Sequence, residues 1–460
     1  MAEIVTISKA CATNPLKSSA PLGAALAYLG IEGSVPLLHG SQGCTSFALV
    51  LAVRHFKEAI PLQTTALDEV SSILGGTSNL EQALLNLQKR MRPRFVGIAS
   101  TSLSETRGED IPGDLKLILA RQPALADTRV VFAATPDYDG ALEDGWAKAV
   151  TAIIEALVVP ADSVVPTGRQ ICLLPGVHQT AADIEALVDI VAAFGLAAVV
   201  LPDISGSLSG TVPDGYCATT LGGTRLADIA ALGCSRHAIA IGEHMRAPAA
   251  CLRERTGVAF SVLPSLTGLA PSDQLVALLA ALSGRPVPLP LRRQRSQLID
   301  AMLDGHFYFG GRRVALAADP DLLGALAGFF AELGAEIVVA VASTAHSAAL
   351  RAVPTQRVSI GDLADFEDAA AAAGAELLVT HSHGRQAAAR LGVPLLRVGL
   401  PIFDRLGAAQ RCTIGYRGTR DLIFEVANIV LAGQHEHTPQ DFARSIVEDT
   451  RHVGATHAPH

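Results

Sequence analysis

The sequence predicts an α/β protein of three doubly wound, Rossmann-like domains, each built on a central parallel sheet. At 460 residues the chain is long enough for about three domains of roughly 150 residues each. Short apolar runs alternate with segments of helical periodicity, which is typical of parallel sheets covered by helices. Half of the residues are hydrophobic (49%) and only 4% are aromatic. This composition favours aliphatic packing of helices on parallel sheets over a β-sandwich.

The first domain is expected at residues 1–165. Its apolar runs predict strands near residues 35–39, 94–100 and 129–135. Ser78 and Glu81 have the spacing of a capping box, which predicts a helix that starts at Ser78 after the turn Gly75-Gly76.

The middle domain is expected at residues 166–290 and the third at residues 291–433. The predicted strands lie near residues 170–176, 196–201, 238–242, 258–263, 313–318, 336–341, 376–380 and 394–398. The proline-rich run 285–290 predicts an extended linker between the two domains. The polar, histidine-containing tail at 434–460 is predicted to be mobile.

Charge and composition exclude several classes of function. The net charge is −8 and the basic residues are scattered, so we expect no nucleic-acid partner. No apolar run reaches the roughly 18 residues that a membrane span requires, and no secretory leader is visible, so we expect a cytoplasmic protein. The seven cysteines form no C-x-x-C pair, which argues against a self-contained zinc or ferredoxin site.

The most informative motif is HGSQGC at residues 39–44, which follows the apolar run 34–38. Iron-sulfur clusters usually take four thiolates, so Cys44 is either structural or one ligand of a site that another chain completes. Gly40 and Gly43 allow the backbone to approach a large inorganic group closely. The amides of the turn, including those of Ser41 and Gln42, can donate hydrogen bonds to cluster sulfides.

Together with that motif, the segment NPLKSSAPLGA at residues 14–24 resembles beta-type chains of the nitrogenase component 1 family. The resemblance extends from about residue 12 to 431 and includes LLRVGLPIFD at 395–404 and GYRGT at 415–419. In catalytic beta chains of this family, P-cluster cysteines stand where this chain has Ser19 and Ser102. Retention of Cys44 without those two cysteines is the pattern of the cofactor-assembly branch. For both serines we expect hydrogen bonding or packing, since a hydroxyl is far harder to deprotonate than a thiol.

The resemblance implies a scaffold on which the nitrogenase iron-molybdenum cofactor is matured from an iron-sulfur precursor before transfer to apo-nitrogenase. Cys44 would be the single ligand from this chain to a [4Fe-4S] cluster shared with a NifE-type partner subunit, within an alpha2beta2 heterotetramer. The precursor, delivered by a NifB-type donor, would be held transiently and mainly by the partner. The nitrogenase iron protein would be a further partner, and no stand-alone catalysis is expected.

Three alternatives stay open. The chain can be a beta-type subunit of a nitrogenase or of a light-independent (proto)chlorophyllide reductase, although the two lost cysteines argue against the nitrogenase reading. It can also be a cluster-free binding module in which Cys44 is buried. His381 and His383 follow a predicted strand, so they are a second candidate metal contact, with a loop histidine pair as the alternative. The remaining six cysteines are expected to be structural.

Overall fold

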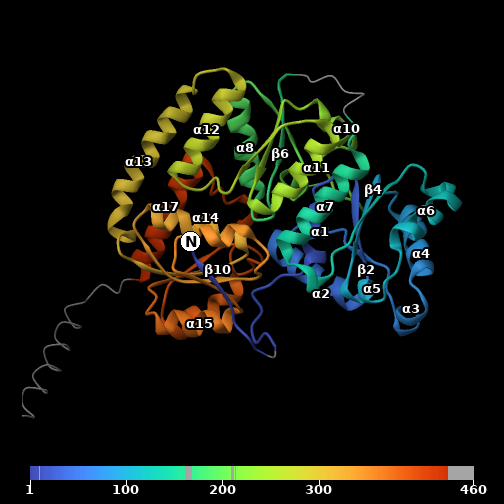
Figure 1. The fold of residues 1–460 in the computed structure, drawn as a ribbon, viewed down its shortest axis with the longest axis horizontal. Coiled ribbons are helices and arrows are strands. Elements are labelled where there is room, and N and C mark those ends of the chain that lie inside the picture. Colours follow the sequence, from blue (N-terminus) through green and yellow to red (C-terminus); the bar gives the residue numbers. More distant parts are fainter. Residues whose placement is uncertain (10, 161–167, 209–211, 213, 434–460) are drawn as a thin grey trace, which may run out of the picture.

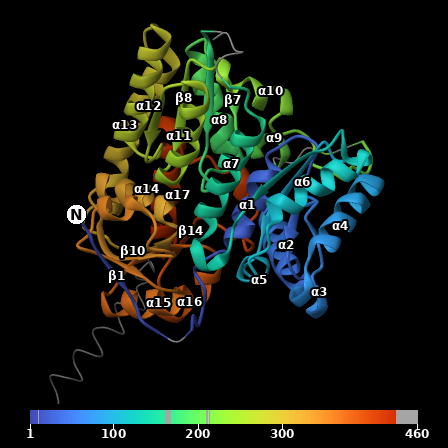
Figure 2. The ribbon, with the colours of Figure 1, turned by 45° about the vertical axis from the view of Figure 1, so that its right-hand side comes forward.

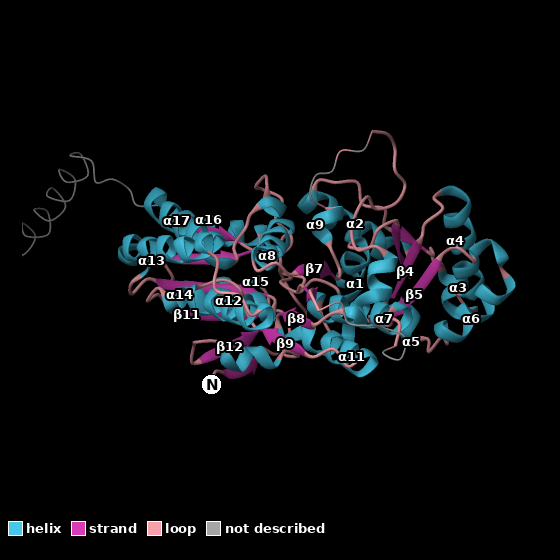
Figure 3. Cartoon of the chain, turned by 90° about the horizontal axis from the view of Figure 1, so that it is seen from above, coloured by secondary structure: helices cyan, strands magenta, loops and turns pink. Residues whose placement is uncertain are grey.

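The computed structural model describes residues 1–9, 11–160, 168–208, 212 and 214–433. These residues form three parallel β-sheets, each covered by helices (Figure 1). From above, helices lie on both sides of the strands (Figure 3). The predicted α/β fold class, with doubly wound, Rossmann-like domains built on central parallel sheets, is confirmed. The predicted mobile tail lies outside the described residues.

The first sheet has the order β3-β2-β4-β5. Its strands are β2 (Ser34–His39), β3 (Gln63–Thr64), β4 (Phe95–Ser100) and β5 (Arg129–Ala133). Helices α1 (Ala20–Leu29) and α7 (Leu142–Leu157) lie side by side on one face (Figure 2), and α4 (Thr77–Arg90) and α6 (Ile111–Arg121) cover the other. Burial of both faces explains why the strands are continuous apolar runs in the sequence.

The predicted capping box at Ser78 is wrong. Helix α4 begins one residue earlier, with Gly76 as its N-cap and no capping bond from a side chain. The Gly76 amide donates to Glu109 at 2.6 Å, and the Thr77 hydroxyl donates to Asp114 at 2.5 Å. Contacts with a distant part of the chain therefore fix the start of this helix, and a local pattern could not reveal them.

The middle sheet has the order β7-β6-β8-β9. Its strands are β6 (Gln170–Leu174), β7 (Ala197–Val200), β8 (His237–Ile241) and β9 (Phe260–Leu263). The helices of this region are α8 (Ala181–Ala193), α9 (Ile204–Ser207), α10 (Leu226–Ala230), α11 (Arg246–Thr256) and α12 (Leu269–Ser283). Helix α13 (Leu289–Phe309) begins inside the proline-rich run, so the predicted linker is wrong at its last two residues. Proline is tolerated there because the first amides of a helix make no intrahelical bond.

The third sheet has the order β1-β12-β11-β10-β13-β14. Its strands are β1 (Glu3–Thr6), β10 (Arg313–Ala318), β11 (Glu336–Ala342), β12 (Arg357–Ile360), β13 (Leu377–Thr380) and β14 (Leu395–Arg397). The helices are α14 (Pro320–Glu332), α15 (Leu363–Ala372), α16 (Arg385–Leu391) and α17 (Gly415–Gly433), and α17 packs along α13. Strand β1 pairs with β12, so residues 3–6 complete the third sheet although the sequence assigned them to the first domain.

Each sheet reverses its winding direction once. The chain passes from β2 to β3 on one side and returns with β4 on the other, and the same reversal occurs at β6 with β8 and at β10 with β13. Open sheets bind ligands beyond the carboxyl ends of the strands at such switch points. No helix in the described part of the chain is both long and apolar enough to cross a membrane.

Candidate cluster site at Cys44

Cys44 lies in the first turn of α2 (Gln42–Phe56), at the switch point of the first sheet. The helix buries one face, formed by Thr45, Ala48, Ala52 and Phe56. Cys44 is on the open side, where the side chain of Phe47 is 77% exposed. An exposed cysteine beside an exposed aromatic ring is not a core residue, so the reading of Cys44 as a buried thiol is wrong.

The loop that precedes Cys44 is fixed by hydrogen bonds. The His39 ring is buried between the hydroxyl of Thr65 (3.1 Å) and the carboxylate of Glu109 (2.9 Å). The His39 carbonyl accepts hydrogen bonds from the hydroxyls of Thr101 and Ser104. These hydrogen bonds fix the carboxyl end of β2, from which the turn to Cys44 starts.

Glu109 anchors this network from the far side. Burial raises its pKa, but the Gly76 amide, His39 and the Arg107 guanidinium outweigh burial, and the pKa is lowered. The carboxylate thus stays ionised and holds the His39 ring at the end of β2.

The two glycines of the motif differ. A Cβ atom at Gly40 would clash with the side chain of Thr101, so internal packing requires a glycine there. A Cβ atom at Gly43 would meet only the Ser41 hydroxyl, at 3.9 Å. Packing within the chain therefore does not explain Gly43. Ser41 is the N-cap of α2 but makes no capping bond, and its hydroxyl lies 3.6 Å from the Cys44 sulfur.

Cys44 borders a cavity of about 390 Å³. One wall is the segment 14–19, another is α2, and a third comes from His381, His383 and Pro401 beside the third sheet. The structure thus brings Cys44, Ser19 and the histidine pair to the same cavity. Cys44 and the histidines follow the carboxyl ends of parallel strands, where open sheets bind ligands. Gln42 is exposed at the start of α2, and Ser102 does not line this cavity.

Ser19 and Ser102 form hydrogen bonds, as expected. The Ser19 hydroxyl caps α1 by accepting from the amide of Leu22 at 3.3 Å. The Ser102 hydroxyl, at the start of α5 (Ser102–Thr106), accepts from the amide of Asp137 at 2.9 Å. Both hydroxyls therefore accept hydrogen bonds from backbone amides.

His381 and His383 lie after β13, as predicted, with their ring centroids 5.2 Å apart. Burial, together with the charge of His383, lowers the pKa of His381 to about 4. Phe403 packs on the ring of His383. A metal-contact role for this pair stays a prediction.

None of the seven cysteines, which all lie among the described residues, forms a disulfide bond. Cys172 is buried within β6, and burial raises the pKa of its thiol to about 12. Cys251 is half-buried on α11, and burial followed by the charge of Glu155 raises its thiol pKa. Raised pKa values keep these thiols protonated, and a protonated thiol is a poor metal ligand.

Sequence reasoning missed two supporting residues, Phe47 and Glu109. Phe47 lies one turn after Cys44, so helical spacing alone could have placed it on the same face. Glu109 pairs with a histidine 70 residues earlier, and no local signal indicates this contact.

Three comparisons place the chain among known proteins. The family model described as nitrogenase component 1 type oxidoreductase matches residues 19–431. A protein of Mesorhizobium japonicum named nitrogenase iron-molybdenum cofactor biosynthesis protein NifN is 57% identical, with 96% of this chain and 95% of the relative covered. A NifN of Klebsiella pneumoniae is 39% identical, with 95% and 94% covered. The solved structure of nitrogenase Cp1 at pH 6.5 superposes with a TM-score of 0.89 and 31% identity, over 95% of this chain and 97% of that chain.

Proposed function

This chain belongs to the nitrogenase component 1 family, and we propose that Cys44 is its one ligand to a [4Fe-4S] cluster shared with a NifE-type partner subunit. Relatives over nearly its whole length are named NifN. The chain is accordingly a scaffold subunit in the biosynthesis of the iron-molybdenum cofactor, a step of nitrogen fixation.

The observation that carries the cluster proposal is the exposure of Cys44 in the first turn of α2, directly after the hydrogen-bonded end of β2. One thiolate leaves three irons of a cubane without protein ligands. Since the thiol points away from the core, thiolates of a second chain can reach the same cluster. The empty space beside Gly43 and the Ser41 hydroxyl near the sulfur suit a sulfide-rich group that accepts hydrogen bonds.

The open face of α2 supports a partner at the same place. Phe47 and Val50 are exposed along it, and aromatic residues are enriched in the cores of protein interfaces. We propose that the NifE-type subunit covers this face and supplies the other three thiolates, within a heterotetramer that contains two copies of each chain.

The remaining partners follow from the scaffold role. The iron-sulfur precursor from a NifB-type donor would be held mainly by the partner subunit, and the nitrogenase iron protein would dock on the assembled complex. A shared [4Fe-4S] cluster would supply one-electron chemistry near that docking event.

A catalytic beta chain is the rival function. Its larger P-cluster takes thiolates at the positions of Ser19 and Ser102, whose hydroxyls here accept hydrogen bonds from backbone amides. With Cys44 as the one cysteine at the cavity, this chain has too few thiolates for its half of such a cluster.

The test is Cys44→Ala in the co-purified two-chain complex, with Cys251→Ala as the matched control. We expect the Cys44 variant to lose most of its stoichiometric cluster iron, with a weakened or altered reduced-state paramagnetic resonance signal and less activation of cofactor-free nitrogenase. Both variants should keep the fold, since neither thiol is fully buried. Wild-type iron content in the Cys44 variant, or equal loss in the control, would refute the assignment.

A further inference from the structure

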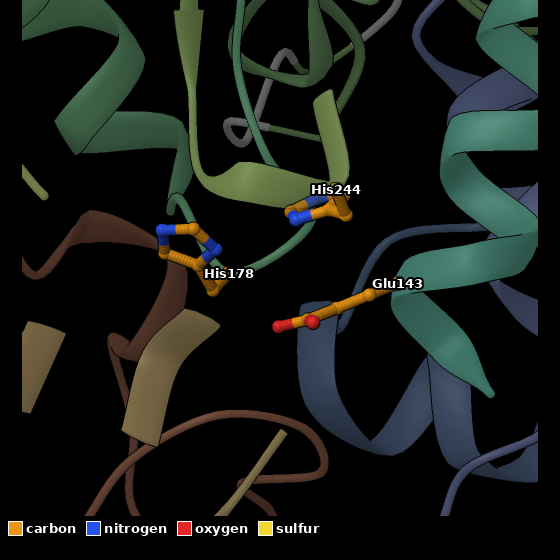
Figure 4. A group of neighbouring side chains, drawn as sticks. All are labelled: Glu143, His178 and His244. Carbon is orange, nitrogen blue, oxygen red and sulfur yellow. The ribbon is translucent and has the colours of Figure 1, made fainter. Parts of the chain in front are cut away.

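A second group of metal-ligating side chains lies away from Cys44. Glu143 stands in the first turn of α7, His178 in the loop between β6 and α8, and His244 in the short turn Glu243–Met245 after β8. Their side chains face a common space (Figure 4), and one ligand atom from each lies within 4.8 Å of the others. The cavities at this group and at Cys44 share no residue.

The position is the switch point of the middle sheet. His178 follows β6 and His244 follows β8, and these two neighbouring strands lie where the winding reverses. Parallel sheets of this kind bind ligands in the crevice at that point. The first region contributes Glu143 and the third contributes Asp321, so the group lies where all three regions meet.

The strongest evidence for ligand binding at this group is the unpaired ring of His178. Both of its ring nitrogens are buried, and neither has a hydrogen-bond partner. Buried polar atoms are almost always paired, because an unpaired one costs about 1–3 kcal/mol. A metal ion would supply the missing partner for one nitrogen.

His244 is oriented as a metal ligand usually is. Its Nδ1 lies 2.5 Å from the carboxylate of Asp321, which also accepts the His244 amide at 2.9 Å. A carboxylate on one ring nitrogen fixes the tautomer and leaves the other nitrogen free to ligate. That nitrogen, Nε2, accepts a long hydrogen bond of 3.3 Å from the amide of Val177, which a bound metal ion would replace.

The site also brings two buried carboxyl groups together. Glu143 and Asp321 are both buried, and an oxygen of the Glu143 side chain accepts a hydrogen bond from the Asp321 amide at 2.9 Å. A dication bound by Glu143 would lie close to both carboxyl groups and would offset their charge.

Two glycines make room for the imidazoles. A Cβ atom at Gly176 would lie 2.6 Å from the His244 ring and 2.8 Å from the His178 ring. At Gly242 it would lie 2.7 Å from Asp321, in a backbone conformation with φ +91° that favours glycine. The ends of β6 and β8 are thus shaped around the two histidines.

We propose that Glu143, His178 and His244 bind one divalent transition-metal ion of the zinc or ferrous class, with Asp321 as the positioning residue. Two imidazoles and one carboxylate are a recurrent ligand set for these ions, with a further position left for water or another ligand. A cavity of about 500 Å³ borders Glu143 and His244 and provides room for that ligand. This site does not depend on the proposed role of Cys44.

The test measures zinc uptake by the two-chain complex after dialysis against a chelator. Metal content per complex by mass spectrometry and competition with a chromogenic chelator give stoichiometry and affinity. We expect one zinc ion per copy of this chain, lost in His178→Ala and retained in Cys44→Ala. Glu143→Gln keeps the shape of the side chain and should weaken binding about 100-fold, while Asp321→Asn should weaken it about 10- to 100-fold.

The matched control is His237→Ala, because His237 is a half-buried histidine of β8 whose ring bonds the Ser261 hydroxyl. It should bind zinc like the wild type. The Glu143→Gln variant keeps the test valid if His178→Ala does not fold. Absence of zinc uptake by the wild type, uptake unchanged in Glu143→Gln, or equal loss in His237→Ala would overturn the proposal.

Discussion

At the scale of single residues, Gly40 and Gly43 have opposite reasons to be glycine. Gly40 faces the side chain of Thr101 inside the chain, whereas Gly43 faces open space beside Cys44. Substitution by alanine should therefore separate internal packing from ligand binding.

We predict that Gly40→Ala lowers the free energy of unfolding by about 1–3 kcal/mol, as overpacking does. Gly43→Ala should leave it within about 0.5 kcal/mol of wild type but lower the cluster iron of the complex. Denaturant unfolding of the chain and iron analysis of the complex measure the two effects. A strongly destabilised Gly43 variant would show that this glycine has a packing role after all.

Ser19 and Ser102 lead to a second prediction. The double variant Ser19→Cys, Ser102→Cys should not assemble a P-cluster with the unmodified partner, because a larger cluster also needs room and matching partner ligands. It should also lose about 0.5–2 kcal/mol of stability, since the Ser19 hydroxyl caps α1. Iron per complex, the visible spectrum and the thermal midpoint test this. A P-cluster-like spectrum would mean that ligand number alone decides cluster type.

At the scale of elements, the N-terminal segment links the third sheet to the Cys44 cavity. Beyond β1, the amide of Thr13 donates to Asp362 at 2.7 Å and the Lys9 ammonium pairs with the same carboxylate at 2.6 Å. Asp362 is also the N-cap of α15. Together with Asp365, which also pairs with Lys9, this carboxylate helps to anchor the chain just before residues 14–19 form a wall of the cavity.

The charge of Asp362 should make that anchor pH-dependent. Burial raises the pKa of Asp362, but Lys9 and the surrounding amides outweigh burial and lower it strongly. A depressed pKa stabilises the fold above the unfolded value of about 3.9, and this contribution is lost as pH falls through the folded value. We predict that Asp362→Asn costs about 1–2 kcal/mol at pH 7 and progressively less below about pH 4.

Urea unfolding of the wild type and of Asp362→Asn between pH 7 and pH 3 measures the difference in their free energies of unfolding. Asp68→Asn is the control, because Asp68 caps α3 (Glu69–Leu74) in the same way without holding the N-terminal segment. A cost of Asp362→Asn that does not change between pH 7 and pH 3 would rule out the charge as its cause.

The sequence predicted the long central strands well and missed three short strands. The strand Arg313–Ala318 was predicted at its observed bounds, because a central parallel strand is apolar throughout. Strands β1, β3 and β12 were missed, since each has four residues or fewer and is only partly buried. Their pairing partners define them, and a local pattern carries little of that information.

The two candidate sites also differ in how much of each the sequence could reveal. Cys44 was proposed as a ligand from the sequence because the motif that contains it is contiguous. Glu143, His178 and His244 come from a helix start and two separate loops, so no spacing motif unites them. A histidine at the end of a predicted strand was the available signal, and it was used for His381 but not for His178.

At the scale of the whole molecule, the open face of α2 should govern assembly. We predict that Phe47→Asp lowers the yield of two-chain complex at least tenfold while the isolated chain stays folded, because the side chain is 77% exposed. Leu117→Asp is the control, since Leu117 is a 61% exposed residue of α6. Co-purification yield and circular dichroism decide the outcome. Normal assembly of the Phe47 variant would show that the partner subunit binds a different surface of this chain.

The pairing of β1 with β12 also has a consequence for the order of events during translation. Thr13 and its anchor Asp362 are 349 residues apart. At about 5–20 residues per second, a ribosome needs roughly 20–70 s to make the intervening chain. During that interval the segment before α1 has neither its strand partner nor its carboxylate anchor. The wall of the Cys44 cavity is therefore among the last parts of the molecule to form, after most of the polypeptide has emerged.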